Sequence, residues 1–246
     1  SRLKLYVKRV FITDDCEGLV PSYLRFLRGI VDSEDLPLNV SRELLQNSKV
    51  LSHIKKALTK RVLSELEKKA KKKPEEFAEF WGNFGAVIKE GIYEDHEQRE
   101  RLMKLSRFTT TASNGELTSL EDYVGRMKDK QSTIYYITGE EADQVAKSPQ
   151  LEGYAARDIE VLLLSDPVDD FWVRSVTDFD GKPLKSVTQG GIDLDEVAPV
   201  KDDSDKPEAA PEADSTTLIV LLKQELGDAV REVRLTDRLA ESPVCL

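Results

Sequence analysis

The sequence contains few of the residues from which metal sites, disulfide frameworks and catalytic triads are built. Its 246 residues include two cysteines and two histidines. Cys16 and Cys245 lie near opposite ends of the chain with no CxxC spacing, which argues against a disulfide framework or a zinc site. His53 and His96 stand in neither HxxxH nor HExxH spacing, so triad or metal chemistry has little to build on. We therefore expect no metal site.

The chain also lacks the glycine-rich loops that cradle phosphates and the apolar runs that cross membranes. Neither GxxxxGK[ST] nor a GxGxxG after a strand occurs, so we do not expect this chain to hydrolyse nucleotides by itself. No apolar run approaches the roughly 18 residues of a membrane helix, and the first residues have no signal-peptide character. We expect a cytoplasmic protein without membrane contact. The missing initiator Met suggests a piece of a longer protein, unless processing removed it.

The composition indicates a folded chain with an uneven distribution of charge. Hydrophobic residues make up 39% and charged residues 33%, with a net charge of -10, which disfavours binding to nucleic acid. Residues 55–73 are the exception, because they hold nine Lys or Arg against Glu65 and Glu67. This basic segment is a candidate surface for an acidic partner. The alternative is the solvated face of an amphipathic helix.

The first half of the chain predicts strands followed by helices. Leu3–Ile12 is typical of one strand entering a buried sheet, and Tyr23–Val31 predicts a second strand. From Val50 to Lys73, apolar residues repeat every four positions and predict a long amphipathic helix. Pro74 should break it. Two further helical stretches follow at 75–89 and 96–105, which together predict a helical coil.

The second half predicts a parallel βαβ unit and then a linker. The predicted elements are a helix at 120–127, a strand at 132–137, a helix at 140–147 and a strand at 159–164. Thr138 with Glu141 resembles a capping box, and Asp166 should cap a helix opened by Pro167. Residues 190–214 have the Gly, Pro and acidic composition of a mobile linker. A helix at 216–226 and a strand at 230–235 then open a further domain.

Arg42 breaks a local rule of helix formation. Ser41 is a good N-cap, so Arg42 falls in the first turn of the predicted helix. A cation there meets the positive end of the helix dipole, which costs about 0.3 kcal/mol or more. Such a violation can mark an anion site, which Gln46 one turn later could share. The alternative is that the adjacent Glu43 neutralises the cation.

Several stretches resemble the ninety-kilodalton heat-shock chaperone family, and its bacterial members in particular. They include RVFITD at 9–14, DSEDLPLNVSRE at 32–43, SLEDYV at 119–124, IYYIT at 134–138 and LSDP at 164–167. The resemblance implies a mixed α/β (α+β) fold. Its parts are the end of a larger αβα sandwich (1–73), a helical coil (74–118), a smaller αβα sandwich (119–189), the linker (190–214) and the truncated start of a further α+β domain (215–246).

The resemblance also implies a role for the loop at 36–46. In the family this loop reaches the separate N-terminal ATPase domain, where the arginine matching Arg42 contacts the ATP γ-phosphate. Gln46 is implicated in the same contact, and Asn39 lies in the same loop. ATP and Mg²⁺ are held by the N-terminal domain, which this chain lacks, as it lacks the C-terminal helices that form the homodimer. We therefore expect no cofactor and no ATPase activity in this chain alone.

The second implied activity is binding of unfolded or partly folded client proteins. Phe171 and Trp172, after an acidic helix start, resemble the client-contact region of the family. Val168 and Val176 bracket Trp172 at helical spacing, so Trp172 could instead belong to the core. The resulting hypothesis is part of an ATP-dependent chaperone. The alternative is a stand-alone interaction module that binds an acidic partner through the basic segment 55–73.

Overall fold

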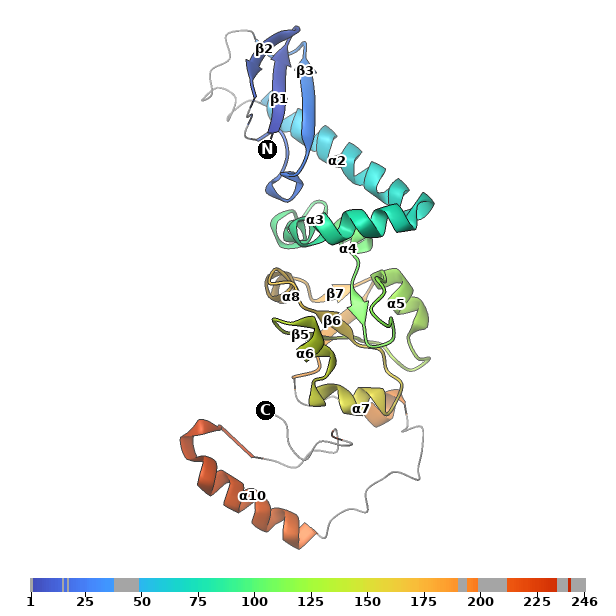
Figure 1. The fold of residues 1–246 in the computed structure, drawn as a ribbon, viewed down its shortest axis with the longest axis vertical. Helices are drawn as coiled ribbons and strands as arrows, with labels where there is room; N and C mark the ends of the chain where they lie inside the picture. Colours follow the sequence, from blue (N-terminus) through green and yellow to red (C-terminus); the bar gives the residue numbers. More distant parts are fainter. Residues whose placement is uncertain are drawn as a thin grey trace.

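The structure, a computed structural model, describes residues 2–14, 16, 18–37, 49–189, 194–198, 212–233 and 239. Helices and two mixed sheets alternate along the chain, which confirms the predicted mixed α/β class. Figure 1 shows the two sheets at different levels of the long axis with helices between them.

The N-terminal sheet has three strands in the order β2-β1-β3. β1 (Arg2–Val7) pairs in parallel with β3 (Arg28–Ser33) and antiparallel with β2 (Val10–Thr13). Strand geometry turns successive side chains to opposite faces. The residues of β1 that are buried on one face are accordingly alternate ones, namely Leu3, Leu5 and Val7.

The predicted single strand over Leu3–Ile12 is wrong, because the chain turns between β1 and β2. Lys8 and Arg9 both have positive φ, at 48° and 64°. Two-residue hairpin turns of this kind normally use Asn or Gly, so the sequence carried no turn signal here. The N–H of Arg9 donates to Asp32 Oδ1 at 3.2 Å, which ties the turn to β3.

The second predicted strand, Tyr23–Val31, is correct only from Arg28 onward. Before it, η1 (Ser22–Leu24) forms a 3₁₀ turn directly after Pro21. Tyr23 is fully buried there, and its hydroxyl donates to Asp95 Oδ2 at 2.8 Å. The apolar character that suggested a strand therefore reflects burial of a turn.

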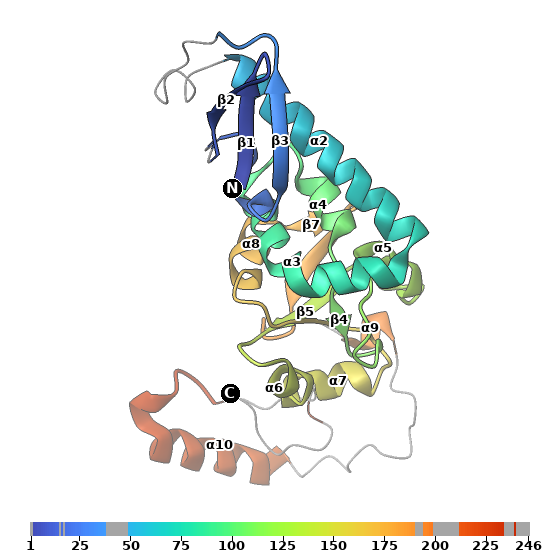
Figure 2. The same cartoon turned by 45° about the horizontal axis from the view of Figure 1, so that its top comes forward.

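Three helices follow the N-terminal sheet along the chain. They are α2 (Lys49–Lys72), α3 (Pro74–Glu94) and α4 (Arg99–Leu105). The predicted break is confirmed, since α2 ends just before Pro74 and α3 begins with it. α2 lies against the N-terminal sheet and meets α3 at a sharp corner (Figure 2). The predicted stripe on α2 faces the core: Leu51, Thr59, Leu63 and Leu66 are buried, and Ile54, Leu58, Val62 and Ala70 are half-buried.

The second sheet has five strands in the order β4-β6-β5-β8-β7. These strands are β4 (Thr109–Thr110), β5 (Ile134–Thr138), β6 (Leu162–Leu164), β7 (Asp178–Phe179) and β8 (Lys182–Ser186). β5 pairs in parallel with β6 and β8, which confirms the predicted parallel βαβ unit. The helical segments around this sheet are α5 (Leu120–Arg126), α6 (Ala142–Ala146), η2 (Pro149–Leu151), α7 (Glu152–Ala155) and α8 (Asp169–Ser175).

Both predicted helix caps in this region are wrong. α6 begins at Ala142 with Glu141 as its N-cap and no side-chain cap bond, so the Thr138 capping box does not form. α8 begins at Asp169 after Val168, also without a side-chain cap bond. The capping box that does form is at α5, where Ser119 and Asp122 cap each other's backbone N–H. Side-chain spacing alone cannot show which candidate cap has the required extended backbone.

One hydrophobic core runs from the N-terminal sheet through the three helices to one face of the second sheet. Leu5 on β1, Ile88 on α3 and Leu162 on β6 all belong to it, and all are fully buried. A second cluster covers the other face of that sheet, so Ile134 and Tyr135 on β5 point into different clusters. The first core continues across the boundaries predicted after residues 73 and 118, which stay predictions.

The predicted linker is partly ordered. α9 (Leu194–Val197) lies within residues 190–214, and Leu194 is buried in the second cluster. α10 (Glu212–Leu226) begins before the predicted end of the linker and confirms the helix expected at 216–226. The short turn η4 (Gly227–Ala229) follows. Of the strand predicted at 230–235, residues 230–233 are described and are not a strand. Apolar side chains can order a segment of linker-like composition when a core accepts them.

Candidate functional site

The three residues predicted to assist ATP hydrolysis, Asn39, Arg42 and Gln46, lie outside the described residues. The described chain on either side is well anchored. Leu36 and Leu51 are 1% and 4% exposed and belong to the same core cluster. The described residues on both sides of Arg42 therefore belong to one core.

The two other predicted site residues are neighbours on α8 with opposite surroundings. Trp172 is fully buried, and its ring centroid lies 5.8 Å from that of Phe108. Phe171 is 62% exposed. Of the two positions left open for Trp172, the structure contains the core residue of an amphipathic helix. Of the two aromatic residues predicted to contact clients, only Phe171 is accessible.

α8 is attached to α3 by a buried ion pair. Lys89 on α3 is 3% exposed and Asp169 on α8 is 1% exposed. Lys89 Nζ donates to Asp169 Oδ1 at 2.7 Å and to Oδ2 at 3.0 Å. It also lies 2.7 Å from Oδ2 of the half-exposed Asp166 and 5.1 Å from the ring centroid of Phe108. The lysine thus bridges the helical coil and the second sheet unit.

Asp169 also accepts hydrogen bonds from residues of its own segment. The indole Nε1–H of Trp172 donates to Asp169 Oδ1 at 2.7 Å, and the N–H of Asp166 donates to Oδ2 at 3.1 Å. Burial raises the pKa of Asp169 because the charged carboxylate loses its water, and Lys89 and Trp172 oppose that rise. A buried charge is tolerated only when paired and hydrogen-bonded in this way.

The sequence analysis did not single out Lys89, although a signal was present. The buried side of α3 includes Trp81, Gly85, Ile88 and Ile92. Lys89 lies four residues after Gly85 and three before Ile92, so the 3.6-residue period places it on this apolar side. A lysine at such a position requires a buried partner. Which carboxylate supplies it depends on the tertiary fold.

The exposed ring of Phe171 is not isolated. Tyr93, near the end of α3, lies with its ring centroid 6.1 Å from that of Phe171, and the two planes meet at 32°. Gly91 lets this end of α3 pack tightly, because a Cβ there would lie 2.8 Å from atoms of Tyr23 and Leu102. The accessible aromatic surface therefore combines one ring from each helix.

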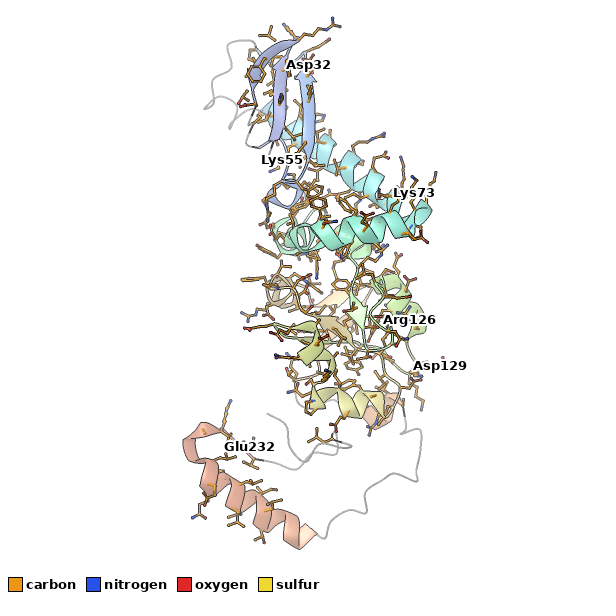
Figure 3. The ribbon with its side chains drawn as sticks, in the orientation of Figure 1. Asp32, Lys55, Lys73, Arg126, Asp129 and Glu232 are labelled. Carbon is orange, nitrogen blue, oxygen red and sulfur yellow. The ribbon has the colours of Figure 1, made fainter. Side chains whose placement is uncertain are left out.

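The basic segment 55–73 forms ion pairs that are exposed to solvent. Several of its cations form ion pairs at 2.7 to 3.1 Å, namely Lys56 with Glu97, Arg61 and Lys68 with Glu65, and Lys69 and Lys73 with Glu76. Figure 3 shows Lys73 at the outer corner where α2 meets α3. These pairs are exposed, and they neutralise part of the predicted basic surface.

The described residues contain no group of three or more His, Cys, Asp or Glu that could hold a metal ion. In the same described part of the chain, no helix is both long enough and apolar enough to cross a membrane.

Comparisons with known proteins agree with one another. A family model described as Hsp90 protein matches residues 1–246. The chaperone protein HtpG of Roseobacter denitrificans is 54% identical over 246 residues, which are 100% of this chain and 40% of that relative. HtpG of Rhizobium meliloti is 57% identical over 248 residues, covering 100% of this chain and 39% of the relative. The chain thus spans about two fifths of the length of these relatives.

A solved structure shows the same fold. The middle domain of a heat shock protein of Plasmodium falciparum superimposes with a TM-score of 0.68 at 35% identity, covering 76% of this chain and 74% of that chain. The match therefore extends to the arrangement of the elements as well as to the sequence. The chain belongs to the Hsp90 family of heat-shock chaperones, and it corresponds to a middle segment of the bacterial HtpG proteins.

Proposed function

We propose that this chain is the middle segment of a cytoplasmic, ATP-dependent chaperone and that Phe171 is its contact for partly folded client proteins. The observation that supports this role is the 62% exposure of a large apolar ring on a helix whose other side is held in the core. Partly folded proteins expose apolar side chains, and contact with this ring removes apolar area of both partners from water.

The client role is tested by comparing Phe171→Ala with Phe11→Ala. Phe11 is a matched control, because it is 52% exposed and its ring lies 5.5 Å from Tyr6 in a comparable aromatic pair. Binding of a fluorescently labelled, permanently unfolded protein is measured by titration with each variant. We expect Phe171→Ala to weaken binding about fivefold, as loss of a contact aromatic does, and Phe11→Ala to leave it unchanged. Equal affinities for all three proteins would remove the role of Phe171.

We also propose that Arg42, assisted by Gln46 and Asn39, completes the ATPase site of a separate N-terminal domain, which holds ATP and Mg²⁺. Membership of the Hsp90 family and the cation at a predicted helix start support this role. A guanidinium supplied from another domain stabilises charge that develops on the transferred phosphate and couples hydrolysis to domain closure. In the whole protein, C-terminal helices beyond this segment would join two such chains.

The hydrolysis role is tested in a full-length HtpG whose matching segment is replaced by this chain. The steady-state ATPase rate of the active chimera is compared with that of its Arg42→Ala variant. Arg61→Ala, which removes an exposed cation of α2, serves as a control for loss of a positive charge. We expect Arg42→Ala to lower kcat tenfold or more, equivalent to about 1.4 kcal/mol of transition-state stabilisation. Equal rates for the chimera and Arg42→Ala would exclude the role.

The alternative function is a stand-alone module that binds an acidic partner through the basic segment 55–73. Lys55, Lys60, Lys71 and Lys72 carry the charge that remains outside the ion pairs described above. Binding that weakens steeply with salt and is unaffected by Arg42→Ala and Phe171→Ala would favour this alternative.

A further inference from the structure

Two aromatic rings lie side by side at the junction of α3 and α8. Of the two predicted client contacts, Phe171 alone is accessible, and Tyr93 from α3 lies beside it with ring centroids 6.1 Å apart. Tyr93 is half-buried, whereas Phe171 is mostly exposed. A ligand that contacts one ring at this distance can therefore contact the other.

The relative position of the two rings depends on the buried ion pair. Lys89 lies one helical turn before Tyr93 on α3, and Asp169 begins the helix that carries Phe171. The contacts of Lys89 Nζ with both oxygens of Asp169 cross the interface between these helices. Both partners are buried, and the hydrogen bonds between them are directional. The pair therefore favours one arrangement of α8 on α3.

Carboxylates outnumber bases around the two rings. Asp170 and Glu94 are the sequence neighbours of Phe171 and Tyr93, and both are exposed. Among the described residues neither forms an ion pair, and Glu94 accepts hydrogen bonds from the hydroxyls of Ser22 and Tyr93. The last turn of α3 contains no basic residue, and Arg174 is the single base on α8. Arg25 also lies near Tyr93 and Glu94, but its guanidinium is held by both carboxylate oxygens of Glu90 on α3. An aromatic surface flanked by carboxylates without ion-pair partners complements a ligand with both apolar and cationic groups, which also gain from cation–π contact.

We propose that Tyr93 and Phe171 form one contact surface for an unfolded polypeptide segment that carries an apolar side chain flanked by lysines or arginines. We further propose that Lys89, through Asp169, is the positioning residue that keeps the two rings together. This inference rests on the proposed client-binding function of Phe171 and adds to it a second ring, a charge preference and a buried support.

The ligand preference is tested with two labelled, disordered peptides of equal length. Both carry the same leucine and phenylalanine residues, flanked by lysine in one and by glutamate in the other. Fluorescence anisotropy with the full 246-residue chain gives Kd for each at low and at moderate salt. We expect the lysine peptide to bind about tenfold more tightly at low salt, with the difference shrinking as salt is added. Equal affinities at low salt would overturn the charge preference.

The two-ring surface is tested with Tyr93→Ala, Phe171→Ala and the double variant, with Phe11→Ala as the control. Each single variant should raise the Kd of the lysine peptide about fivefold, and the double variant by less than the product of the two. If Phe171→Ala has no effect, the proposed function itself fails. If Phe171→Ala weakens binding while Tyr93→Ala does not, the client role stands and the two-ring surface is wrong.

The positioning role is tested with Lys89→Met and with Lys89→Arg, which keeps the charge. Kd is measured at a temperature where circular dichroism shows each variant fully folded, so that loss of stability alone does not change it. We expect Lys89→Met to weaken binding as much as Tyr93→Ala and Lys89→Arg to restore part of the affinity. If Lys89→Met does not fold, Asp166→Asn, which removes only the half-exposed partner, is used and should give a smaller loss. Wild-type affinity in the folded variant used would overturn the positioning role.

Discussion

Lys89 and Lys73 make the same kind of contact in opposite surroundings. Each places its Nζ 2.7 Å from a carboxylate oxygen, Lys89 with Asp169 and Lys73 with Glu76. The side chains of the first pair are 4% and 1% exposed, and those of the second are 61% and 51% exposed. Geometry alone therefore does not separate them, and only burial does.

The difference shows which contacts hold the molecule together. At the surface, water and salt replace a lost partner, so an exposed ion pair contributes little to stability. In the interior nothing replaces it, so removal of one partner leaves a charge without water. We expect loss of the ion pair at the α3–α8 junction to lower the free energy of unfolding. Loss of the ion pair at the α2–α3 corner should leave it unchanged.

The largest effect is expected for Lys89→Met, which keeps most of the side-chain volume and removes the charge. Asp169 then stays buried without its cation, and the free energy of unfolding should fall by about 3 kcal/mol. Chemical denaturation of wild type and variant measures the difference. A loss as small as that of an exposed pair would end the distinction between the two regions.

The pH dependence of that difference sharpens the assignment to Asp169. Burial already raises the pKa of Asp169, and loss of Lys89 should raise it further. An acid whose pKa is raised in the folded state favours folding below its unfolded pKa, and this contribution is lost as pH rises through the folded pKa. The gap between wild type and Lys89→Met should therefore be widest near neutral pH and shrink in acid. A gap independent of pH would mean that another group carries the cost.

Arg101 offers an intermediate case between the buried and exposed pairs. Its Nε and Nη2 donate to the two oxygens of Glu67 at 2.8 and 3.0 Å, and the two side chains are 29% and 37% exposed. Arg101→Ala should lower the free energy of unfolding by about 1.5 kcal/mol, because bidentate charged hydrogen bonds are lost in partial contact with water. Thermal or urea unfolding should rank this variant between the two lysine variants. A cost equal to that of Lys89→Met would show that burial does not set the scale.

The smallest effect is expected for Lys73→Ala at the α2–α3 corner. Its pair with Glu76 is exposed, and Glu76 keeps its contact with Lys69. The urea midpoint should be indistinguishable from that of wild type at moderate salt. A clear shift of the midpoint would indicate that the corner, rather than the buried junction, needs its charges.

Much of the fold could be predicted from local sequence, and the errors have identifiable causes. The break at Pro74 and the parallel pairing of β5 with β6 were predicted correctly, because proline chemistry and hydrophobic period act locally. The turn at Lys8 and Arg9 was missed, since it uses positive φ without glycine or asparagine. The order of α9 was missed because it depends on a core that accepts Leu194.

The candidate site divides in the same way. Phe171 and Trp172 were identified together, but their sequence positions did not show which ring is accessible, because both can fit an amphipathic helix. Tyr93 and Lys89 were not identified, since their partners are about 80 residues away along the chain. The roles of Arg42, Gln46 and Asn39 stay predictions from the sequence.

The sequence by itself determined the family, the mixed α/β class and most helices and strands, because these follow from residue order, hydrophobic period and breaker residues. Only the tertiary structure decided that Trp172 is core and Phe171 is surface, and that Lys89 meets Asp169 across two helices. The physical reason is that burial is a property of packing between distant segments. The same contact between a lysine and a carboxylate contributes little to stability in water, whereas loss of one partner in a core is strongly destabilising.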